Sequence, residues 1–202
     1  VTSPNYLEHS EALSPYKDKC VIIPNVIFPK KLELANLEAV KTVKERFGNK
    51  PIVFFLGRHV EYKGLKYLIE SASHISSECV ILIAGSGPLT EQLMNSATDE
   101  RIVFLGRISD EDIPVYMHAA DIFAFPSITK NEAFGIALLE AMISQKTSVT
   151  FRVKGSGISY VCPNNVCGKE ARLYDCKEFA SNIEMLCNDQ DLNKMLGLNA
   201  YN

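Results

Sequence analysis

The sequence has little of what several classes of protein require. It has no tryptophan and only four histidines, and none of its six cysteines forms a C-x-x-C pair, so the pattern does not favour a zinc site. The 21 basic and 24 acidic residues are interspersed and leave a formal charge of −3, which argues against nucleic acid as the partner. No apolar run reaches the roughly 18 residues of a membrane-spanning helix. What remains, 47% hydrophobic and 22% charged, is the composition of a globular domain.

The cysteines indicate a reduced protein. Cys79 lies inside an apolar run and is expected to be a core thiol. Cys162 and Cys167 flank a Pro-Asn-Asn segment and could pair, although disulfides are rare in cytosolic proteins. The alternative is six free thiols.

From residue 51 onward, apolar runs alternate with helical patterns. The runs are 51–57, 80–84, 102–106, 121–125 and 147–150, and the expected helices are 64–74, 88–97, 109–119, 134–143 and one or two within 177–196. The runs are apolar throughout rather than alternating, as in strands that are buried on both faces. This order predicts an α/β fold with a parallel sheet and helices on both faces.

The first 50 residues are less regular. Residues 21–25 predict a short strand, and residues 32–47 predict a helix. The apolar side of that helix would carry Leu34, Leu37, Val40 and Val43. Residues 1–19 are polar and begin with valine, so we expect a linker or the tail of a preceding domain.

Ligands of open parallel sheets bind beyond the carboxyl ends of the strands. The loop after the first run places Arg58 and Lys63 between Gly57 and Gly64, just before a helix. Arginine grips phosphate in a bidentate way, glycine lets backbone approach an anion, and a helix N-terminus offers amide donors. This loop suits a diphosphate, and the alternative is a solvated surface loop.

A second candidate surrounds the helix at 134–143. This helix is apolar nearly all round, so Glu140 in its middle needs either a cation or the hydroxyl groups of a ligand. Glu132 lies just before the helix at the predicted ligand edge, and Gly135 frees backbone there for an anion. The alternative makes Glu132 a helix-start residue and Glu140 half of a structural ion pair.

Three weaker signals lie at the same edge. The segment at Gly85 is an incomplete dinucleotide fingerprint and is better explained as a tight turn lining the cleft. Arg107 and Ile108 border either a nucleobase or a plain loop. The glycine-rich loop 154–160 either contacts a sugar or phosphate or is a simple turn. Three histidines are expected to be ordinary surface or boundary residues: His59, His74 and His118.

Taken in order, these motifs resemble the retaining glycosyltransferases of the family-4 type, which have the GT-B fold. The matching motifs are Gly57-Arg58 with Lys63-Gly64, Ala84–Pro88, Phe104–Gly106, Glu132–Gly135 and Glu140. The resemblance implies that residues 20–188 are the Rossmann-like C-terminal domain that binds the nucleotide-sugar donor. Residues 1–19 would be a remnant of the N-terminal domain, and residues 189–202 a C-terminal tail at the start of a truncated helix.

The resemblance also implies roles. Arg58 and Lys63 would hold the donor diphosphate and Glu132 would contact the sugar, which makes these three the expected catalytic residues. Glu140 would accept hydrogen bonds from the ribose. The full expected donor-binding set is Gly57, Arg58, Lys63, Gly85, Arg107, Ile108, Glu132, Phe134, Gly135, Ile136 and Glu140. No metal and no cofactor is expected, because the cations would neutralise the diphosphate.

One departure points to the biology. The family often has Gly-Gly-x-Pro-Glu after the fifth strand, whereas this chain has Gly155–Tyr160, a variant that we associate with bacterial surface-polysaccharide enzymes. We therefore expect a cytoplasmic enzyme that transfers a sugar to a saccharide or lipid-linked acceptor bound through the N-terminal domain. Peripheral membrane association of the full-length protein is compatible with this. Three alternatives stay open: a GT-B-type epimerase or phosphorylase, a non-catalytic nucleotide-binding or interaction module, and a dehydrogenase.

Overall fold

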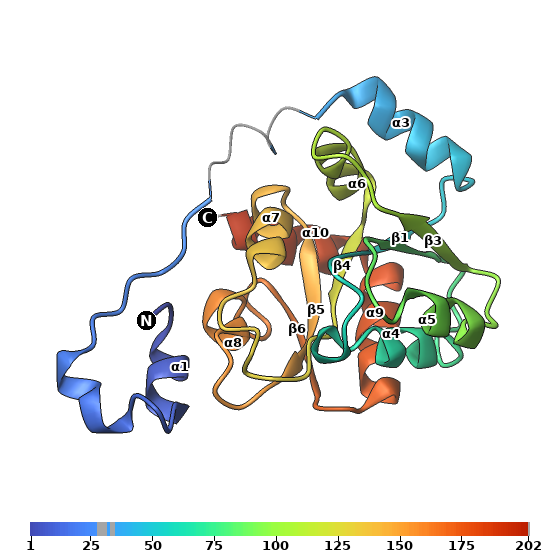
Figure 1. The fold of residues 1–202 in the computed structure, drawn as a ribbon. Coiled ribbons are helices and arrows are strands. Elements are labelled where there is room, and N and C mark those ends of the chain that lie inside the picture. Colours follow the sequence, from blue (N-terminus) through green and yellow to red (C-terminus); the bar gives the residue numbers. More distant parts are fainter. Residues whose placement is uncertain (28–31, 33–34, 202) are drawn as a thin grey trace.

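The computed structural model describes residues 1–27, 32 and 35–201 and has a single six-stranded sheet at its centre (Figure 1). The strand order is β3-β2-β1-β4-β5-β6, and every neighbouring pair is parallel. The strands are β1 (Ile52–Leu56), β2 (Val80–Ala84), β3 (Ile102–Gly106), β4 (Ile122–Phe125), β5 (Thr147–Arg152) and β6 (Gly168–Arg172). The direction of strand order reverses between β1 and β4, which is where sheets of this order form their ligand crevice.

Helices cover both faces of the sheet, as predicted. One face packs against α4 (Leu65–Ala72), α5 (Thr90–Ser96) and α9 (Cys176–Asn188). The other packs against α3 (Leu37–Arg46), α6 (Ile113–Ala119), α7 (Ile136–Ile143) and α8 (Ile158–Val161). The alternating side chains of each strand divide into two apolar clusters, one per face. The Rossmann-like α/β fold is therefore confirmed.

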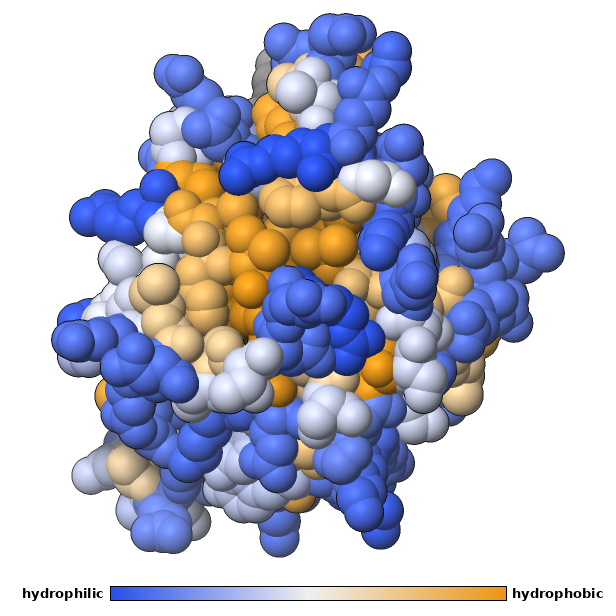
Figure 2. Space-filling view, turned by 90° about the vertical axis from the view of Figure 1, so that its right-hand side faces the viewer, coloured by the Kyte–Doolittle hydropathy of each residue, from blue (hydrophilic) through white to orange (hydrophobic). Residues whose placement is uncertain are grey.

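The edge strand β3 is less covered than the others. Its apolar residues are only half-buried, whereas those of β4 are fully buried. Figure 2 shows an apolar area in the middle of this side of the molecule. No helix among the described residues is long and apolar enough to cross a membrane.

The amino-terminal segment lies beside the main body in Figure 1 and contains α1 (Pro4–His9) and η1 (Ser14–Lys19). The predicted strand at 21–25 is wrong, because residues 20–27 form no strand and Val21 and Ile23 are each 68% exposed. These two residues pair only with Val1, whose nitrogen donates to Val21 O (2.8 Å) and whose carbonyl accepts from Ile23 N (2.8 Å). A strand needs a longer partner than one residue.

The helix predicted over 32–47 begins later. Asn36 caps α3 by accepting hydrogen bonds from the amides of Glu38 (3.0 Å) and Ala39 (3.2 Å). Val40 and Val43 pack on the sheet as predicted, whereas Leu37 is 79% exposed because it lies in the first turn. Leu34 lies outside the described residues.

The sequence pattern missed β6 and shortened the C-terminal helices. The segment Gly168–Arg172 contains one apolar side chain, Ala171, so it carries no apolar run, and it joins the sheet by pairing with β5. The helical tail is two helices, α9 and α10 (Gln190–Tyr201), and α10 packs on β5, α7 and α9. All six cysteines are free thiols, including the buried Cys162 and Cys167.

The contact between α10 and the sheet depends on one glycine. A Cβ on Gly197 would lie 2.3 Å from the carbonyl oxygen of Gln145, so the helix backbone touches the chain just before β5. Leu196 and Ala200 on either side are buried. This close approach explains why a helix-weakening residue stands in mid-helix.

We predict that Gly197→Ala destabilises the domain. Alanine ordinarily stabilises a helix by up to about 1 kcal/mol relative to glycine, but forced overpacking costs about 1–3 kcal/mol. Urea unfolding should therefore show a net loss, while Lys194→Ala on the exposed side of the same helix leaves the free energy of unfolding within about 0.5 kcal/mol. A more stable Gly197→Ala variant would contradict the described packing.

Candidate functional site

A pocket of about 430 Å³ opens where β1, β2 and β3 end. Its lining residues are Leu56, Gly57, Arg58, Gly85, Ser86, Gly87, Arg107 and Ile108. Five of these eight belong to the predicted donor-binding set. The structure therefore brings together, from three separate loops, residues that the sequence places at one sheet edge.

At the base of this pocket, the backbones of the loops after β1, β2 and β3 are in direct contact. Gly85 has φ +115°, and a Cβ there would lie 1.9 Å from the carbonyl oxygen of Gly57, so only glycine fits. The amide of Gly85 donates to the carbonyl oxygen of Gly106 (2.7 Å), which joins the second loop to the third. The interpretation of Gly85 as a tight turn lining the cleft is confirmed.

Two arginines give the pocket its charge. Arg58 and Arg107 are both exposed, and neither guanidinium bonds to any side chain or carbonyl among the described residues. Arginine stays charged at all physiological pH values and offers five donors. The pocket thus presents two unneutralised cations above a glycine floor, an arrangement suited to a phosphorylated ligand.

Lys63 and Glu132 form an ion pair between the loop that follows β1 and the loop that follows β4. Their side chains are only 12% and 11% exposed. The same Glu132 oxygen accepts a hydrogen bond from Ser127 Oγ (3.2 Å), and Lys63 Nζ lies 5.0 Å from the centre of the Phe125 ring. Because α7 begins only at Ile136, Glu132 is not a helix-start residue, and the alternative interpretation of it is wrong.

This ion pair adjoins the pocket without lining it. A Cβ on Gly57 would lie 3.8 Å from Lys63 Cε, so the lysine stem packs beside the pocket wall. The positive charge of Lys63 is already balanced by Glu132, whereas that of Arg58 is not. The structure therefore separates the two cations that the sequence grouped in one loop.

The glycine-rich loop 154–160 supports Glu132. Ser156 is 1% exposed, and its hydroxyl donates to the main-chain carbonyl of Glu132 (2.6 Å). A Cβ on Gly157 would lie 2.1 Å from the carbonyl oxygen of Ala133. This loop is not a simple flexible turn, because its middle is packed against the Glu132 loop.

The start of α7 is open. Gly135 has φ +87° and no side chain caps the helix, while Phe134 is buried and Ile136 is 53% exposed. The expectation of a buried helix therefore holds only in part: Ile136 in the first turn is exposed, Leu138 and Ala141 are buried, and the remaining residues of α7 are half-buried. An uncapped N-terminus leaves amide donors that favour an anion.

Glu140 is half-buried and has no ion-pair or hydrogen-bond partner for its carboxylate among the described residues. A structural ion pair is thus excluded within this part of the chain. Burial, with a smaller contribution from the negative charge of Asp110, raises the pKa of Glu140 above its ordinary value of 4.5. Since Asp110 follows Ile108 by two residues, the Glu140 carboxylate faces the third loop of the pocket.

Sequence reasoning missed several neighbours of the site. Ser127 and Ser156 hold Glu132, and His59 is fully buried rather than at the surface, whereas Ser86 and Gly87 line the pocket as the segment at Gly85 predicts. Serines in loops give no periodic signal. His74 is exposed and His118 is half-buried, as predicted.

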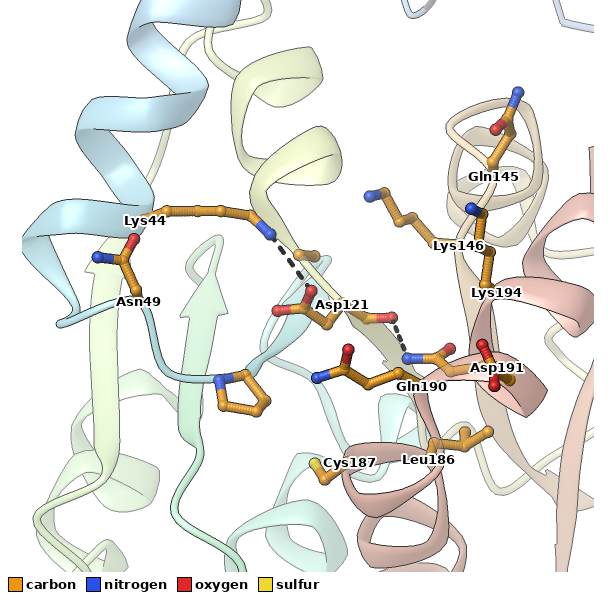
Figure 3. A pocket seen from close by; sticks show the side chains of 13 residues that line it. Lys44, Asn49, Asp121, Gln145, Lys146, Leu186, Cys187, Gln190, Asp191 and Lys194 are labelled. Atoms are coloured by element: carbon orange, nitrogen blue, oxygen red, sulfur yellow. Dashed lines mark hydrogen bonds and ion pairs between the residues drawn. The ribbon is translucent and has the colours of Figure 1, made fainter.

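A larger pocket of about 630 Å³ lies at the opposite, amino-terminal edge of the sheet (Figure 3). Its charged groups are largely engaged with protein. Lys44 pairs with Asp121 (3.3 Å), and Lys146 donates to His118 O (2.9 Å), while burial lowers the pKa of Lys146 to about 8. None of the predicted donor-binding residues lines it. Since parallel sheets bind ligands at their carboxyl ends, the smaller pocket is the candidate site.

The sheet order, the crevice between β1 and β4 and the glycine-rich pocket define a Rossmann-like domain of the GT-B type. Residues 37–202 match the family described as glycosyl transferases group 1, and the chain belongs to this family.

Curated relatives agree. The chain is 28% identical to the O-antigen chain mannosyltransferase C of Escherichia coli over 98% of this chain and 53% of that protein. It is 30% identical to the D-rhamnosyltransferase WbpZ of Pseudomonas aeruginosa over 79% of this chain and 42% of that protein. The chain thus spans about half the length of these relatives.

Solved structures show the same fold. Anabaena Alr3699/HepE in complex with UDP and glucose superposes with a TM-score of 0.80 at 22% identity, over 90% of this chain and 50% of that one. The C-terminal domain of a glycosyl transferase group 1 family protein (LpcC) from Francisella tularensis, solved as a separate domain, gives 0.71 at 20% identity over 87% and 95%.

We predict that Glu140→Gln stabilises the domain at pH 7. The raised pKa means that the folded state holds the Glu140 proton more tightly than the unfolded chain does. Stability is therefore lost as the pH rises through the unfolded and then the folded pKa, and glutamine avoids this loss.

Urea unfolding at several pH values tests this prediction. The advantage of Glu140→Gln should be largest at pH 7 and should vanish below the ordinary carboxyl pKa of 4.5. The matched control is the exposed Glu100→Gln, which should show no such pH dependence. A Glu140→Gln variant that is less stable than the wild type at pH 7 would mean that the carboxylate has a favourable partner.

Proposed function

We propose that this chain is the donor-binding half of a retaining glycosyltransferase that takes its sugar from a nucleoside diphosphate sugar. The observation that carries the proposal is the glycine-floored pocket with two unpaired arginines, Arg58 and Arg107, at the carboxyl ends of β1 and β3. The solved relatives that hold UDP or UDP-glucose support the same ligand class. Relatives named as GDP-mannose-dependent support the class without deciding the base.

In this proposal, the diphosphate lies over Gly57 and Gly85 with Arg58 beside it. As the bond from the sugar to the diphosphate breaks, negative charge builds up on the departing nucleoside diphosphate. Preorganised cations that face such charge are commonly the largest contribution to catalysis. The positive charge of Arg58 faces the leaving group directly. The positive charge of Lys63 does so once the ligand draws the lysine side chain away from Glu132. No metal is required in this scheme.

The acidic residues meet the hydroxyl-rich parts of the donor. Glu132 at the start of the α7 loop contacts the sugar, and the amides of Phe134 to Ile136 face the phosphate. Glu140, which lacks a protein partner among the described residues, accepts hydrogen bonds from the ribose next to Arg107 and Ile108. The hydroxyl groups of such a ligand would thus donate hydrogen bonds to Glu140, whose burial without a partner destabilises the free domain.

The acceptor belongs to the other half of the enzyme. Residues 1–19 are proposed to be the end of a preceding domain, which would supply the acceptor site across the cleft. The exposed Val21 and Ile23 are apolar side chains that such a domain would cover. Transfer then needs both halves, because catalysis requires the donor sugar and the acceptor to be held together in a reactive orientation.

Two curated relatives support a proposal for the biological setting. An O-antigen mannosyltransferase and a D-rhamnosyltransferase are 28% and 30% identical to this chain. We propose hexosyl transfer to a saccharide or lipid-linked acceptor in bacterial surface-polysaccharide synthesis, by a cytoplasmic enzyme that works at the inner face of the membrane.

A thermal-shift screen of the 202-residue chain with UDP, GDP, ADP and NAD tests the donor site. A ligand that binds only the native state raises the free energy of unfolding by mass action, by about 2.7 kcal/mol at one hundred times its Kd, and so raises the unfolding temperature. We predict a shift with one nucleoside diphosphate, unchanged by EDTA, and no shift with NAD. Arg58→Ala and Glu140→Ala should weaken binding at least about tenfold, since charge-assisted hydrogen bonds contribute about 1.5–3 kcal/mol each.

The control is Arg46→Ala, which removes an exposed arginine from α3, away from the pocket. It should leave the shift unchanged. The absence of a shift with every diphosphate, confirmed by calorimetry, would contradict the proposal. Binding by this chain without donor consumption by the full-length enzyme would favour a non-catalytic module, and a free epimer as product would favour an epimerase.

A further inference from the structure

His59 lies directly behind the pocket but does not line it. Its side chain is fully buried, although it follows the exposed Arg58 in the loop after β1. The ring sits among aromatic neighbours, with centroids 6.4 Å from Phe55 and 6.1 Å from Phe104. A histidine in such a place needs a reason, because burial penalises its polar nitrogens.

One ring nitrogen is bonded and the other is not. Nδ1 lies 2.9 Å from Thr90 Oγ1, at the start of α5, whereas Nε2 is buried without a partner among the described residues. Burial lowers the pKa of His59 below its ordinary value, and the backbone of Ala84 acts on it in the opposite direction with a smaller effect. A phenylalanine would fill the same space without an unsatisfied nitrogen. The contribution specific to histidine is therefore the bond to Thr90.

Thr90 is in turn bonded to the second loop of the pocket. Its Oγ1 accepts a hydrogen bond from the amide of Gly87 (2.8 Å) and lies 2.9 Å from the carbonyl oxygen of the same residue. Gly87 is a lining residue of the pocket. The side chain of His59 thus reaches the rim of the second loop through one hydroxyl group.

The main chain of His59 makes a second set of bonds to that loop. Its amide donates to Ser86 O (3.1 Å), and its carbonyl accepts from Leu89 N (3.2 Å). A Cβ on Gly87 would lie 2.4 Å from His59 O, so the two backbones touch. His59 is thus joined to the segment 85–90 by three hydrogen bonds, to Ser86, Leu89 and Thr90.

These bonds fix the backbone that carries Arg58. On the other side of Arg58, the amide of Gly57 donates to Ala84 O (3.2 Å). Gly57 and His59, the two neighbours of Arg58, are therefore held by the end of β2 and the loop that follows it. The Arg58 guanidinium itself is unpaired among the described residues. A ligand that binds Arg58 then has to order only the side chain, which lowers the entropic cost of binding.

We propose that His59 is a positioning residue that acts through Thr90 to hold the Arg58 backbone and the Ser86–Gly87 rim in the geometry that binds the donor diphosphate. This inference rests on the proposed function, since it concerns the affinity of the same pocket. It assigns His59 no contact with the ligand and no proton transfer.

The test compares four variants of the 202-residue chain by calorimetric titration with the diphosphate that binds the wild type. His59→Phe keeps a ring but loses the Nδ1 bond, and Thr90→Val keeps the shape but loses the hydroxyl. Both should raise Kd about tenfold. Thr90→Ser keeps the hydroxyl and His59→Asn keeps a polar atom near the Nδ1 position, so both should stay within about threefold of the wild type.

Two thermodynamic cycles separate positioning from a merely structural role. The double variant His59→Phe with Thr90→Val should bind no more weakly than the worse single variant, because both remove one linkage. In an Arg58→Ala background, His59→Phe should raise Kd by less than it does in the wild type, because the part of its effect that acts through Arg58 is already lost. A general loss of packing would instead add in full to the Arg58→Ala effect.

Unfolding in urea, measured alongside, confirms that each variant is fully native under the titration conditions. If His59→Phe does not fold, the Thr90→Val and Thr90→Ser pair decides the question alone. Native His59→Phe and Thr90→Val variants that bind as tightly as the wild type would overturn the inference and leave the proposed function intact. Failure of the wild type to bind any diphosphate would overturn both.

Discussion

The ion pair between Lys63 and Glu132 joins the loop after β1 to the loop after β4, at the place where the strand order reverses. The site depends on this link, because the loop after β1 leads to α4 on one face of the sheet and the loop after β4 leads to α7 on the other. Ser127 and Ser156 hold Glu132 from its side chain and its main chain. Breaking one partner of a buried pair leaves an uncompensated charge, so the arrangement is costly to disturb. The free domain thus holds Glu132 and Lys63 in fixed positions relative to each other.

On the other side of β1, the loops are joined mainly through backbone, with one side-chain link from His59 through Thr90 to Gly87. Gly57 touches Gly85, Gly85 bonds to Gly106, and His59 bonds to Ser86 and Leu89. Side chains would not fit at these contacts, so the glycines set the floor and the arginines are left free above it. The charge of Lys63 is neutralised by Glu132, in a pair that joins two loops. The charges of Arg58 and Arg107, which line the pocket, have no acidic partner among the described residues and are left for a ligand.

The parallel sheet and the sheet edge that carries the site could be predicted from the sequence, because five continuous apolar runs mark buried strands and the glycines and cations follow them. The sixth strand could not, because Gly168–Arg172 has one apolar residue and is defined by pairing with β5. The strand at 21–25 failed for the converse reason: an apolar run without a sheet beside it stays exposed. Likewise, nothing in the local sequence tells that Lys63 pairs with Glu132, 69 residues away, or that His59 turns inward to Thr90.

The central claim is that a nucleoside diphosphate binds at the carboxyl ends of β1, β2 and β3. Amide hydrogen exchange of the 202-residue chain, with and without the saturating diphosphate, tests it most directly because it locates the ligand. The account predicts added protection in the loops 57–60, 85–90 and 106–108. Protection confined to the segments beside the larger pocket at the opposite edge, around Asn49 and Gln145, would contradict it.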